Sequence, residues 1–364
     1  MVSRMTNQTS YSGWQGIINE YRQFLPVDET DDVITLHEGN TPLVRSHTIG
    51  PDLGLELYFK YEGANPTGSF KDRGMALAVT KAKARGAQAI ICASTGNTSA
   101  SAAAYAARAG LKAIVIVPRD KIALGKLAQA LAYDAQLIAV DGNFDQALDI
   151  VRQLANSYPE IELVNSLNPY RIPGQRSGAF EVCDTLGCAP DMLAIPMGNA
   201  GNITAYWQGF KAYKQAGVVS SLPLLAGFQA EGAAPIVDGH AVAAPETRAT
   251  AVRIGNPANW KLALSALEES SGVTAAISEG AIVEGYLLLA REGLLAEPAS
   301  ALTVAGLRHL HRAGMMPAGV RTVVAVLTGN GLKDPEFALN FGARPLDMPA
   351  NLGVISRVVE TWLR

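Results

Sequence analysis

Short apolar runs alternate with longer helix-compatible stretches, and this alternation constrains the fold more than any other feature of the chain. The first runs that predict strands are residues 57–61, 89–93, 112–117, 136–140 and 161–164. The stretches between them are rich in Ala, Leu and Lys without internal Pro, which predicts helices at 71–85, 98–109, 124–133 and 144–157. This is the pattern of βαβ units around a parallel sheet, and strands with so few polar residues need cover on both faces.

A second series of the same kind follows. Its expected strands and helices are 192–195, 203–215, 224–229, 260–270, 274–277, 279–292, 299–311 and 322–327. The two series predict an α/β protein with two lobes, and Pro169, Pro173 and Gly174 favour a hinge between them. Residues 231–259 show no clear periodicity, so they are either a long irregular connection near the site or a surface loop.

Composition excludes several classes of protein. Of 364 residues 48% are hydrophobic and 17% charged, which is not the composition of a disordered chain. The net charge of −3 without runs of like charge predicts no nucleic-acid partner and no membrane surface. We find no apolar signal-peptide core and no membrane-length apolar run, and therefore expect a soluble cytoplasmic protein.

The cysteines and histidines give no sign of a metal site. Cys92, Cys183 and Cys188 lack a CxxC pair, which argues against a disulfide framework or a structural zinc site and fits a reducing cytoplasm. The histidines that show no ligand spacing are His37, His47, His240, His309 and His311. We therefore expect no metal.

A lysine stands where a polar turn, residues 65–70, becomes a predicted helix. The positive end of the helix dipole disfavours a further cation there, and with desolvation it lowers the pKa of the Lys71 amine. A neutral amine is the nucleophile that forms a Schiff base with an aldehyde. The alternative is an ordinary surface lysine.

Three further turns join strands to the segments that follow them. Residues 94–99 offer hydroxyls, backbone N–H groups and the Asn97 amide, which suit a carboxylate and a phenolate oxygen, although Ser and Thr also cap helices. Residues 198–202 (GNAGN) favour a phosphate; they do not form a GxGxxG fingerprint or a Walker motif. Thr328 follows the strand 322–327, where open α/β sheets collect ligands; the alternative is a simple turn.

Together these turns describe one ligand, pyridoxal 5′-phosphate: an aldehyde for Lys71, a phosphate for 198–202, a ring oxygen for Asn97 and a ring nitrogen for Thr328. Here the chain resembles the fold-type II pyridoxal phosphate enzymes, and among them the threonine synthase family. The resemblance covers residues 36–334. It is carried by the stretches EGNTPL (38–43), NPTGSFKDRG (65–74), STGNTS (94–99), NSLNPYR (165–171), GNAGN (198–202), EPASA (297–301) and TGNGLKD (328–334).

The resemblance implies conversion of O-phospho-L-homoserine and water to L-threonine and phosphate. It implies that Lys71 binds the cofactor and shuttles protons, that Thr328 faces the ring nitrogen, and that the released phosphate acts as an acid or base. The residues expected to hold the cofactor are Lys71, Asn97, Gly198, Asn199, Ala200, Gly201, Asn202 and Thr328.

The substrate needs its own anion pocket. A guanidinium can bind phosphate through two parallel hydrogen bonds, so Arg171 with Asn165 and Ser166 is the first choice. Lys60 is the second candidate, with an exposed strand-edge lysine as the alternative. The substrate carboxylate is assigned to Ser94, Thr95 and Thr98. Glu297, beside a helix start, is left as a supporting residue.

The resemblance also implies the domain organisation: two doubly wound, open parallel-sheet lobes of the tryptophan synthase β-like kind. Residues 71–164 form the small domain, inserted in a large domain of 1–70 plus 165–364. A homodimer is expected, with residues 1–35 available for its contacts, and regulation by S-adenosylmethionine is not expected.

Two other functions stay open. A serine or threonine dehydratase shares the lysine motif, but its phosphate loop normally has four consecutive glycines and it has no use for a second phosphate pocket. A catalytically silent ligand-binding protein would show no absorbance band of the bound cofactor.

Overall fold

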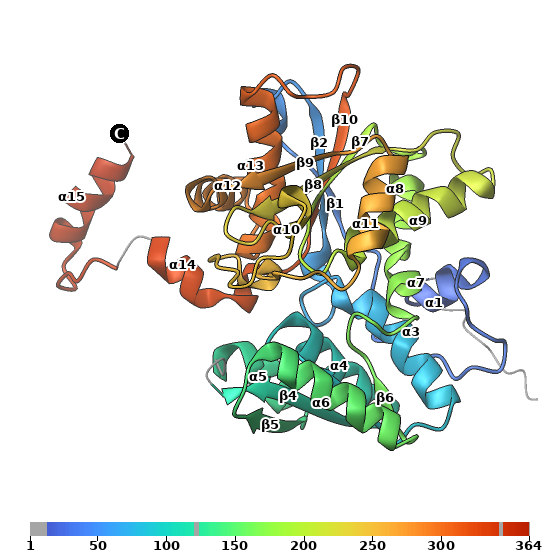
Figure 1. Ribbon diagram of the computed structural model, residues 1–364. Coiled ribbons are helices and arrows are strands. Elements are labelled where there is room, and N and C mark those ends of the chain that lie inside the picture. Colours follow the sequence, from blue (N-terminus) through green and yellow to red (C-terminus); the bar gives the residue numbers. More distant parts are fainter. Residues whose placement is uncertain (1–12, 120–123, 342–344, 364) are drawn as a thin grey trace, which may run out of the picture. The chain divides into compact units, whose positions relative to one another are not determined.

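The computed structural model describes residues 13–119, 124–341 and 345–363, and its larger sheet has six strands in these residues. The strands are β1 (Leu43–Arg45), β2 (Glu56–Tyr61), β7 (Met192–Pro196), β8 (Leu224–Ala230), β9 (Val273–Ile277) and β10 (Thr322–Leu327). Their order is β1-β2-β10-β7-β8-β9 (Figure 1). All neighbours pair in parallel except the edge strand β1, which runs antiparallel to β2.

A second sheet has four strands in the described residues, all parallel, in the order β5-β4-β3-β6. They are β3 (Ala89–Ala93), β4 (Lys112–Pro118), β5 (Gln136–Val140) and β6 (Ile161–Leu163). The helices of this part are α3 (Lys71–Ala84), α4 (Asn97–Ala109), α5 (Leu124–Ala132) and α6 (Phe144–Ser157). The whole of this sheet therefore lies in sequence between β2 and β7 of the larger one.

Helices cover both faces of the smaller sheet. Ile90 and Cys92 of β3 share a core with the alanine-rich α4, whereas the alternate residue Ile91 packs with Ala147 and Val151 of α6. Because successive side chains of a strand point to opposite faces, β3 needs apolar residues at every position. The predicted α/β fold with parallel sheets is confirmed, as are the predicted strands and helices, whose bounds differ by at most two residues.

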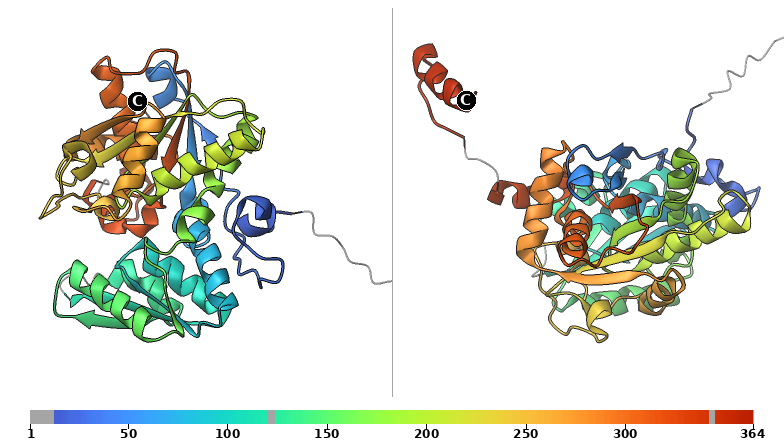
Figure 2. Two further views of the ribbon diagram at one scale, coloured as in Figure 1. Left: turned by 45° about the vertical axis from the view of Figure 1, so that its right-hand side comes forward. Right: turned by 90° about the horizontal axis from the view of Figure 1, so that it is seen from above.

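The main helices around the larger sheet come from residues 171–312 (Figure 2). They are α7 (Arg171–Gln175), α8 (Ser177–Leu186), α9 (Gly201–Gln215), α10 (Pro235–Asp238), α11 (Trp260–Glu269), α12 (Glu279–Arg291) and α13 (Pro298–Arg312). Near the N-terminus and in loops lie α1 (Ile17–Glu20), α2 (Ile49–Asp52), η1 (Arg22–Phe24), η2 (Glu62–Ala64), η4 (Thr250–Val252) and η5 (Gly331–Lys333). No described helix is long and apolar enough to cross a membrane.

Residues 335–364 form a separate unit with α14 (Pro335–Phe341) and α15 (Leu352–Trp362). The edge strand β1 and α15 were not expected from the sequence. The division into 1–70 plus 165–364 and 71–164 stays a prediction, and residues 1–12 of the predicted dimer segment lie outside the described residues.

Two helices meet at glycines close to the start of α3. A Cβ on Gly74 would lie 2.7 Å from the carbonyl oxygen of Arg171, and a Cβ on Gly174 would clash with the carbonyl oxygen of Arg73. The backbones of α3 and α7 are therefore in direct contact, which side chains larger than hydrogen would prevent.

Gly74→Ala is expected to lower the free energy of unfolding by about 1–3 kcal/mol, the usual cost of overpacking. The matched control is Gly280→Ala in α12, where a Cβ would meet no atom within 4 Å; a gain of about 0.5 kcal/mol is expected there, because alanine restricts the unfolded chain. Denaturant unfolding of both variants checks this, and equal stabilities would contradict the crossing.

Candidate active site

The loop before α3 is fixed by its own carboxylate and by the segment after β10. The backbone N–H of Thr67 donates to Asp72 over 2.7 Å, and the Thr67 hydroxyl donates to the same carboxylate over 2.5 Å. The N–H of Phe70 donates to the carbonyl of Thr328, and that of Asn330 to the carbonyl of Gly68. Lys71 and Thr328 are thereby brought side by side, although 257 positions separate them in the chain.

Lys71, the first residue of α3, is partly buried. Desolvation and the neighbouring positive charge of Arg171 lower the pKa of the Lys71 amine to about 7, and the negative charge of Glu297 opposes this shift. Its Nζ lies 4.3 Å from the centroid of the Phe70 ring. A large fraction of the amine is therefore neutral at physiological pH, as an attack on an aldehyde requires.

The rate at which a small aldehyde labels Lys71 in the cofactor-free protein is expected to rise between about pH 6 and 8 and then level off. The neutral fraction of an amine grows as pH passes through its pKa, which is about 7 for Lys71 and about 10.4 for an exposed lysine. Reductive labelling followed by peptide mass spectrometry measures this, with the exposed Lys112 as the reference. Parallel pH profiles for the two lysines would contradict the lowered pKa.

The turn at residues 94–99 faces the segment after β10 through one buried glutamate. Asn97, the first residue of α4, donates its Nδ2 to Glu297 Oε2 over 2.9 Å. The Thr328 hydroxyl donates to Glu297 Oε1 over 3.0 Å and lies 3.1 Å from the hydroxyl of Ser300. Burial raises the pKa of Glu297. Two residues expected at the cofactor ring thus donate hydrogen bonds to the same carboxylate. The sequence indicated this carboxylate, Glu297, only as a supporting residue beside a helix start.

The loop at residues 198–202 lies at the N-terminus of the 15-residue helix α9. Ala200 has a φ of 60°, and the side-chain nitrogen of Asn202 is buried without a hydrogen-bond partner among the described residues. Asn259 donates to the carbonyl of Asn199, and Val252 lies against Gly198. The irregular segment 231–259 therefore supports this loop, and an anion here would meet free N–H groups.

Arg171, at the start of α7, is buried and has no carboxylate in ion-pair distance among the described residues. One nitrogen donates to the carbonyl of Val164 over 2.7 Å, and its Nε has no hydrogen-bond partner in the same part of the chain. Burial lowers the pKa of Arg171 to about 10. A buried guanidinium without a counter-ion is costly, so the position suits an anion supplied by a ligand.

The remaining predicted substrate residues lie around these groups. Asn165 binds the end of β3 through both atoms of its amide, which contact the backbone N–H and carbonyl of Ala93. Ser166 is partly exposed beside it. Thr95 and Thr98 are partly exposed in the turn that begins α4, and Ser94 accepts from the N–H of Gly96. Asn165 therefore ties the strand that carries this turn to the segment that carries Arg171.

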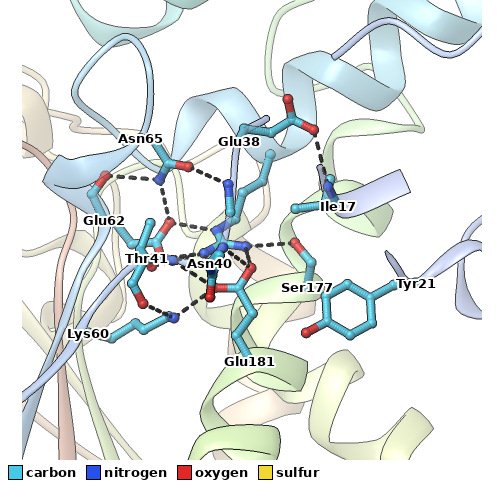
Figure 3. Close-up of polar contacts among 12 residues, drawn as sticks. Ile17, Tyr21, Glu38, Asn40, Thr41, Lys60, Glu62, Asn65, Ser177 and Glu181 are labelled. Atoms are coloured by element: carbon cyan, nitrogen blue, oxygen red, sulfur yellow. Dashed lines mark hydrogen bonds and ion pairs between the residues drawn. The ribbon is translucent and has the colours of Figure 1, made fainter. Parts of the chain in front are cut away.

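Lys60 is engaged elsewhere, in a buried network of charged side chains (Figure 3). Its Nζ lies 2.7 Å from both Glu181 Oε2 and the carbonyl oxygen of Thr41, and 1% of the side chain is exposed. Arg73 donates to Glu62 and to Glu181 through paired hydrogen bonds of 2.5–2.8 Å. The structure thus gives no support to Lys60 as a phosphate ligand, and it excludes an exposed strand-edge lysine.

Sequence reasoning missed this network although Arg73 is only two residues from Lys71. The positive charges of Arg73 and Lys60 lower the pKa of Glu181 to about 2, although burial alone would raise it. The network joins α3, which begins at Lys71, to β2 and α8.

The described residues contain no cluster of His, Cys, Asp or Glu that could hold a metal ion.

Comparison of the sequence and the fold with those of known proteins identifies the enzyme family. The family model "Pyridoxal-phosphate dependent enzyme" matches residues 34–329. A solved threonine deaminase from T.th. superposes with a TM-score of 0.68 and 26% identity, over 86% of this chain and 96% of that one. A maize serine racemase superposes with a TM-score of 0.72 over 96% and 98%; at 18% identity it shows the fold alone. The chain belongs to the pyridoxal-phosphate dependent enzymes of fold type II.

Three curated relatives of the chain are threonine synthases. A threonine synthase of Halalkalibacterium halodurans is 57% identical over 90% of this chain and 92% of its own length. One from Synechocystis is 57% identical over 91% and 87%, and one from Methanocaldococcus jannaschii is 48% identical over 93% and 86%. Within the pyridoxal-phosphate dependent enzymes, the chain is a member of the threonine synthase family.

Proposed function

We propose that the protein converts O-phospho-L-homoserine and water to L-threonine and phosphate, the carbon–oxygen lyase reaction of its family. The observation that carries this proposal is the buried guanidinium of Arg171, which belongs to α7 and not to the loop at 198–202, and which has no carboxylate partner among the described residues. A phosphorylated cofactor and a phosphorylated substrate need two separate anion sites. An enzyme that acts on an unphosphorylated amino acid needs only the first.

The residues present fit pyridoxal phosphate. The unpartnered amide of Asn202 and the N-terminus of α9 suit its phosphate, and the amine of Lys71, with its pKa near 7, suits its aldehyde. When bound, the cofactor supplies an electron sink beside the reacting carbon atoms of the substrate. Asn97 and Thr328 would orient its ring.

The protein's own side chains bind the substrate and transfer its protons. In this proposal Arg171, Asn165 and Ser166 hold the substrate phosphate, while Ser94, Thr95 and Thr98 hold its carboxylate at the start of α4. Lys71, once free, takes and returns protons along the substrate, for which a pKa near the working pH is best.

Product analysis of the pyridoxal phosphate-loaded protein tests the proposal. With O-phospho-L-homoserine we expect phosphate and L-threonine in equal amounts, and with L-serine or L-threonine little 2-keto acid. Efficient deamination of L-threonine without action on phosphohomoserine would replace the proposal by the dehydratase alternative. A folded protein that shows no cofactor absorbance would favour the silent binding protein.

We also propose a cytoplasmic homodimer. The support is membership of a biosynthetic enzyme family and the absence of a membrane-length apolar helix among the described residues. Sedimentation velocity on the purified protein tests the dimer, and a monomeric mass would refute it.

A further inference from the structure

Gln175, the last residue of α7, has a buried amide whose oxygen is unpaired. The residue is 4% exposed, and its Oε1 has no hydrogen-bond partner among the described residues. A buried amide oxygen without a partner is costly, because folding removes the water that would bind it. We therefore looked for a donor within its reach.

Such a donor lies one helical turn earlier. Arg171 and Gln175 are four residues apart in α7, a spacing that places their side chains on the same face of a helix. The N–H at Nε of Arg171 is buried, and in the part of the chain that the structure describes it also has no hydrogen-bond partner. The unpaired atoms of the two side chains are thus a donor and an acceptor, which are complementary.

Both side chains lie against the same point of α3. A Cβ built on Gly74 would lie 2.8 Å from Arg171 Nε and 2.9 Å from Gln175 Nε2. Glycine leaves room for both groups here because it has no side chain. The last torsion of a glutamine is soft, and a half-turn about it exchanges the amide nitrogen and oxygen. That half-turn brings Oε1 to the side of Gly74 on which Arg171 Nε lies.

The same kind of pairing is present one residue further along the chain. Arg176 donates from Nε over 3.0 Å and from a terminal nitrogen over 2.5 Å to the side-chain oxygen of Gln208. A glutamine oxygen from α9 therefore orients that guanidinium. This pair shows the geometry that a glutamine and an arginine adopt in this protein.

Holding Nε would fix the orientation of the Arg171 guanidinium. An arginine has five N–H donors in one plane. One terminal nitrogen of Arg171 already donates to the carbonyl of Val164 over 2.7 Å. With Nε bound to Gln175, the plane is held at two points, and both terminal nitrogens still keep an N–H for a ligand. Two such groups can bind a phosphate through parallel hydrogen bonds.

We propose that Gln175 is a positioning residue of the substrate-phosphate site: its oxygen accepts from Nε of Arg171 and turns the two terminal nitrogens toward the phosphate. This inference rests on the proposed function, in which Arg171 holds the phosphate of the substrate. A neutral amide orients the guanidinium without cancelling its charge, which stays available for the phosphate dianion. A carboxylate in the same place would compete with that dianion.

Gln175→Met tests the proposal, because methionine has a similar length but no amide oxygen. Calorimetric titration of the pyridoxal phosphate-loaded protein with inorganic phosphate measures the site without turnover. We expect the phosphate affinity to fall about tenfold, the usual effect of losing one hydrogen bond to a charged group. KM for O-phospho-L-homoserine should rise by a similar factor while kcat stays within about twofold. A role in packing alone would leave phosphate affinity unchanged.

Two further variants make the test specific. In an Arg171→Ala background, Gln175→Met should lower kcat/KM for O-phospho-L-homoserine no further, because Gln175 acts through Arg171; an additional tenfold loss there overturns the proposal. Gln208→Met is the matched control, since it removes the oxygen that accepts from Arg176. It should bind phosphate as the wild type does.

Gln175→Glu keeps the test decisive where Gln175→Met fails to fold. Glutamate has nearly the same size, but its charge neutralises the guanidinium, so phosphate should bind more weakly than to the wild type. Wild-type phosphate affinity in Gln175→Met or in Gln175→Glu overturns the inference.

The inference and the proposed reaction can fail separately. If phosphate binding depends on Gln175 but the wild type releases no phosphate from O-phospho-L-homoserine, the proposed reaction is wrong and the inference holds. If the wild type releases phosphate and Gln175→Met has an unchanged KM, the inference alone is wrong. A loaded wild-type protein that neither binds phosphate nor releases it from the substrate overturns both.

Discussion

Lys71→Ala is expected to lose turnover by at least about a thousandfold, because the variant lacks both the covalent attachment of the cofactor and the proton-transferring amine. The protein should still fold, since the ammonium makes no ion pair with the described residues and the loop is held by Asp72 and the backbone. Pyridoxal phosphate should bind more weakly and exchange freely. Phosphate release from O-phospho-L-homoserine and dialysis of the loaded protein measure the two effects.

Lys83→Ala is the matched control for this experiment. Lys83 lies in the same helix, α3, and pairs with Asp32 at the surface. Its loss should leave turnover within about twofold, because exposed ion pairs contribute little. Turnover by Lys71→Ala at the control's rate would be decisive against Lys71 as the cofactor lysine.

Arg171→Ala is expected to reduce kcat/KM for O-phospho-L-homoserine by about 30-fold to several thousandfold, which corresponds to about 2–5 kcal/mol for truncating a buried charged partner. Cofactor binding should survive, because its phosphate is assigned to residues 198–202. Side-reaction deamination of L-serine, which carries no phosphate, should change little. Steady-state kinetics with both substrates checks this selectivity.

Arg176→Ala provides the comparison, since Arg176 follows α7 and donates its hydrogen bonds to Gln208 of α9. It should affect both substrates equally and slightly. If Arg171→Ala abolishes cofactor binding while sparing affinity for phosphohomoserine, the two phosphate sites have been exchanged.

Periodicity was sufficient to predict most strands and helices, because βαβ units bury their strands on both faces and the pattern is local. The edge strand β1 escaped prediction since it has only three residues and precedes the alternating series of strands and helices, which begins at residue 57. The candidate turns could be predicted for a similar reason: each comes after a strand of a parallel sheet, and ligands of open α/β sheets bind at the carboxyl ends of the strands.

Long-range partners could not be predicted from local pattern. Lys60 finds its counter-ion in Glu181, which is 121 positions away, and Asn97 finds Glu297 across 200 positions. A strand lysine without a visible partner favours an exposed or ligand-facing role, so the sequence alone gave no sign of the buried ion pair that Lys60 forms. Conversely, nothing in the local sequence connects Glu297 with Asn97 and Thr328, the two side chains that donate hydrogen bonds to it.

The glycine crossing of α3 and α7 also sets a length. Lys71 lies three residues before Gly74, and Arg171 lies three residues before Gly174, so backbone contact fixes the distance between the two backbone positions that carry the amine and the guanidinium. While the two backbones touch, only the side chains of Lys71 and Arg171 can change the distance between the amine and the guanidinium. In the proposed site, the crossing therefore restricts the distance between the groups that bind the amino end and the phosphate end of the substrate: we expect a phosphorylated amino acid with one methylene more or fewer to be a poorer substrate.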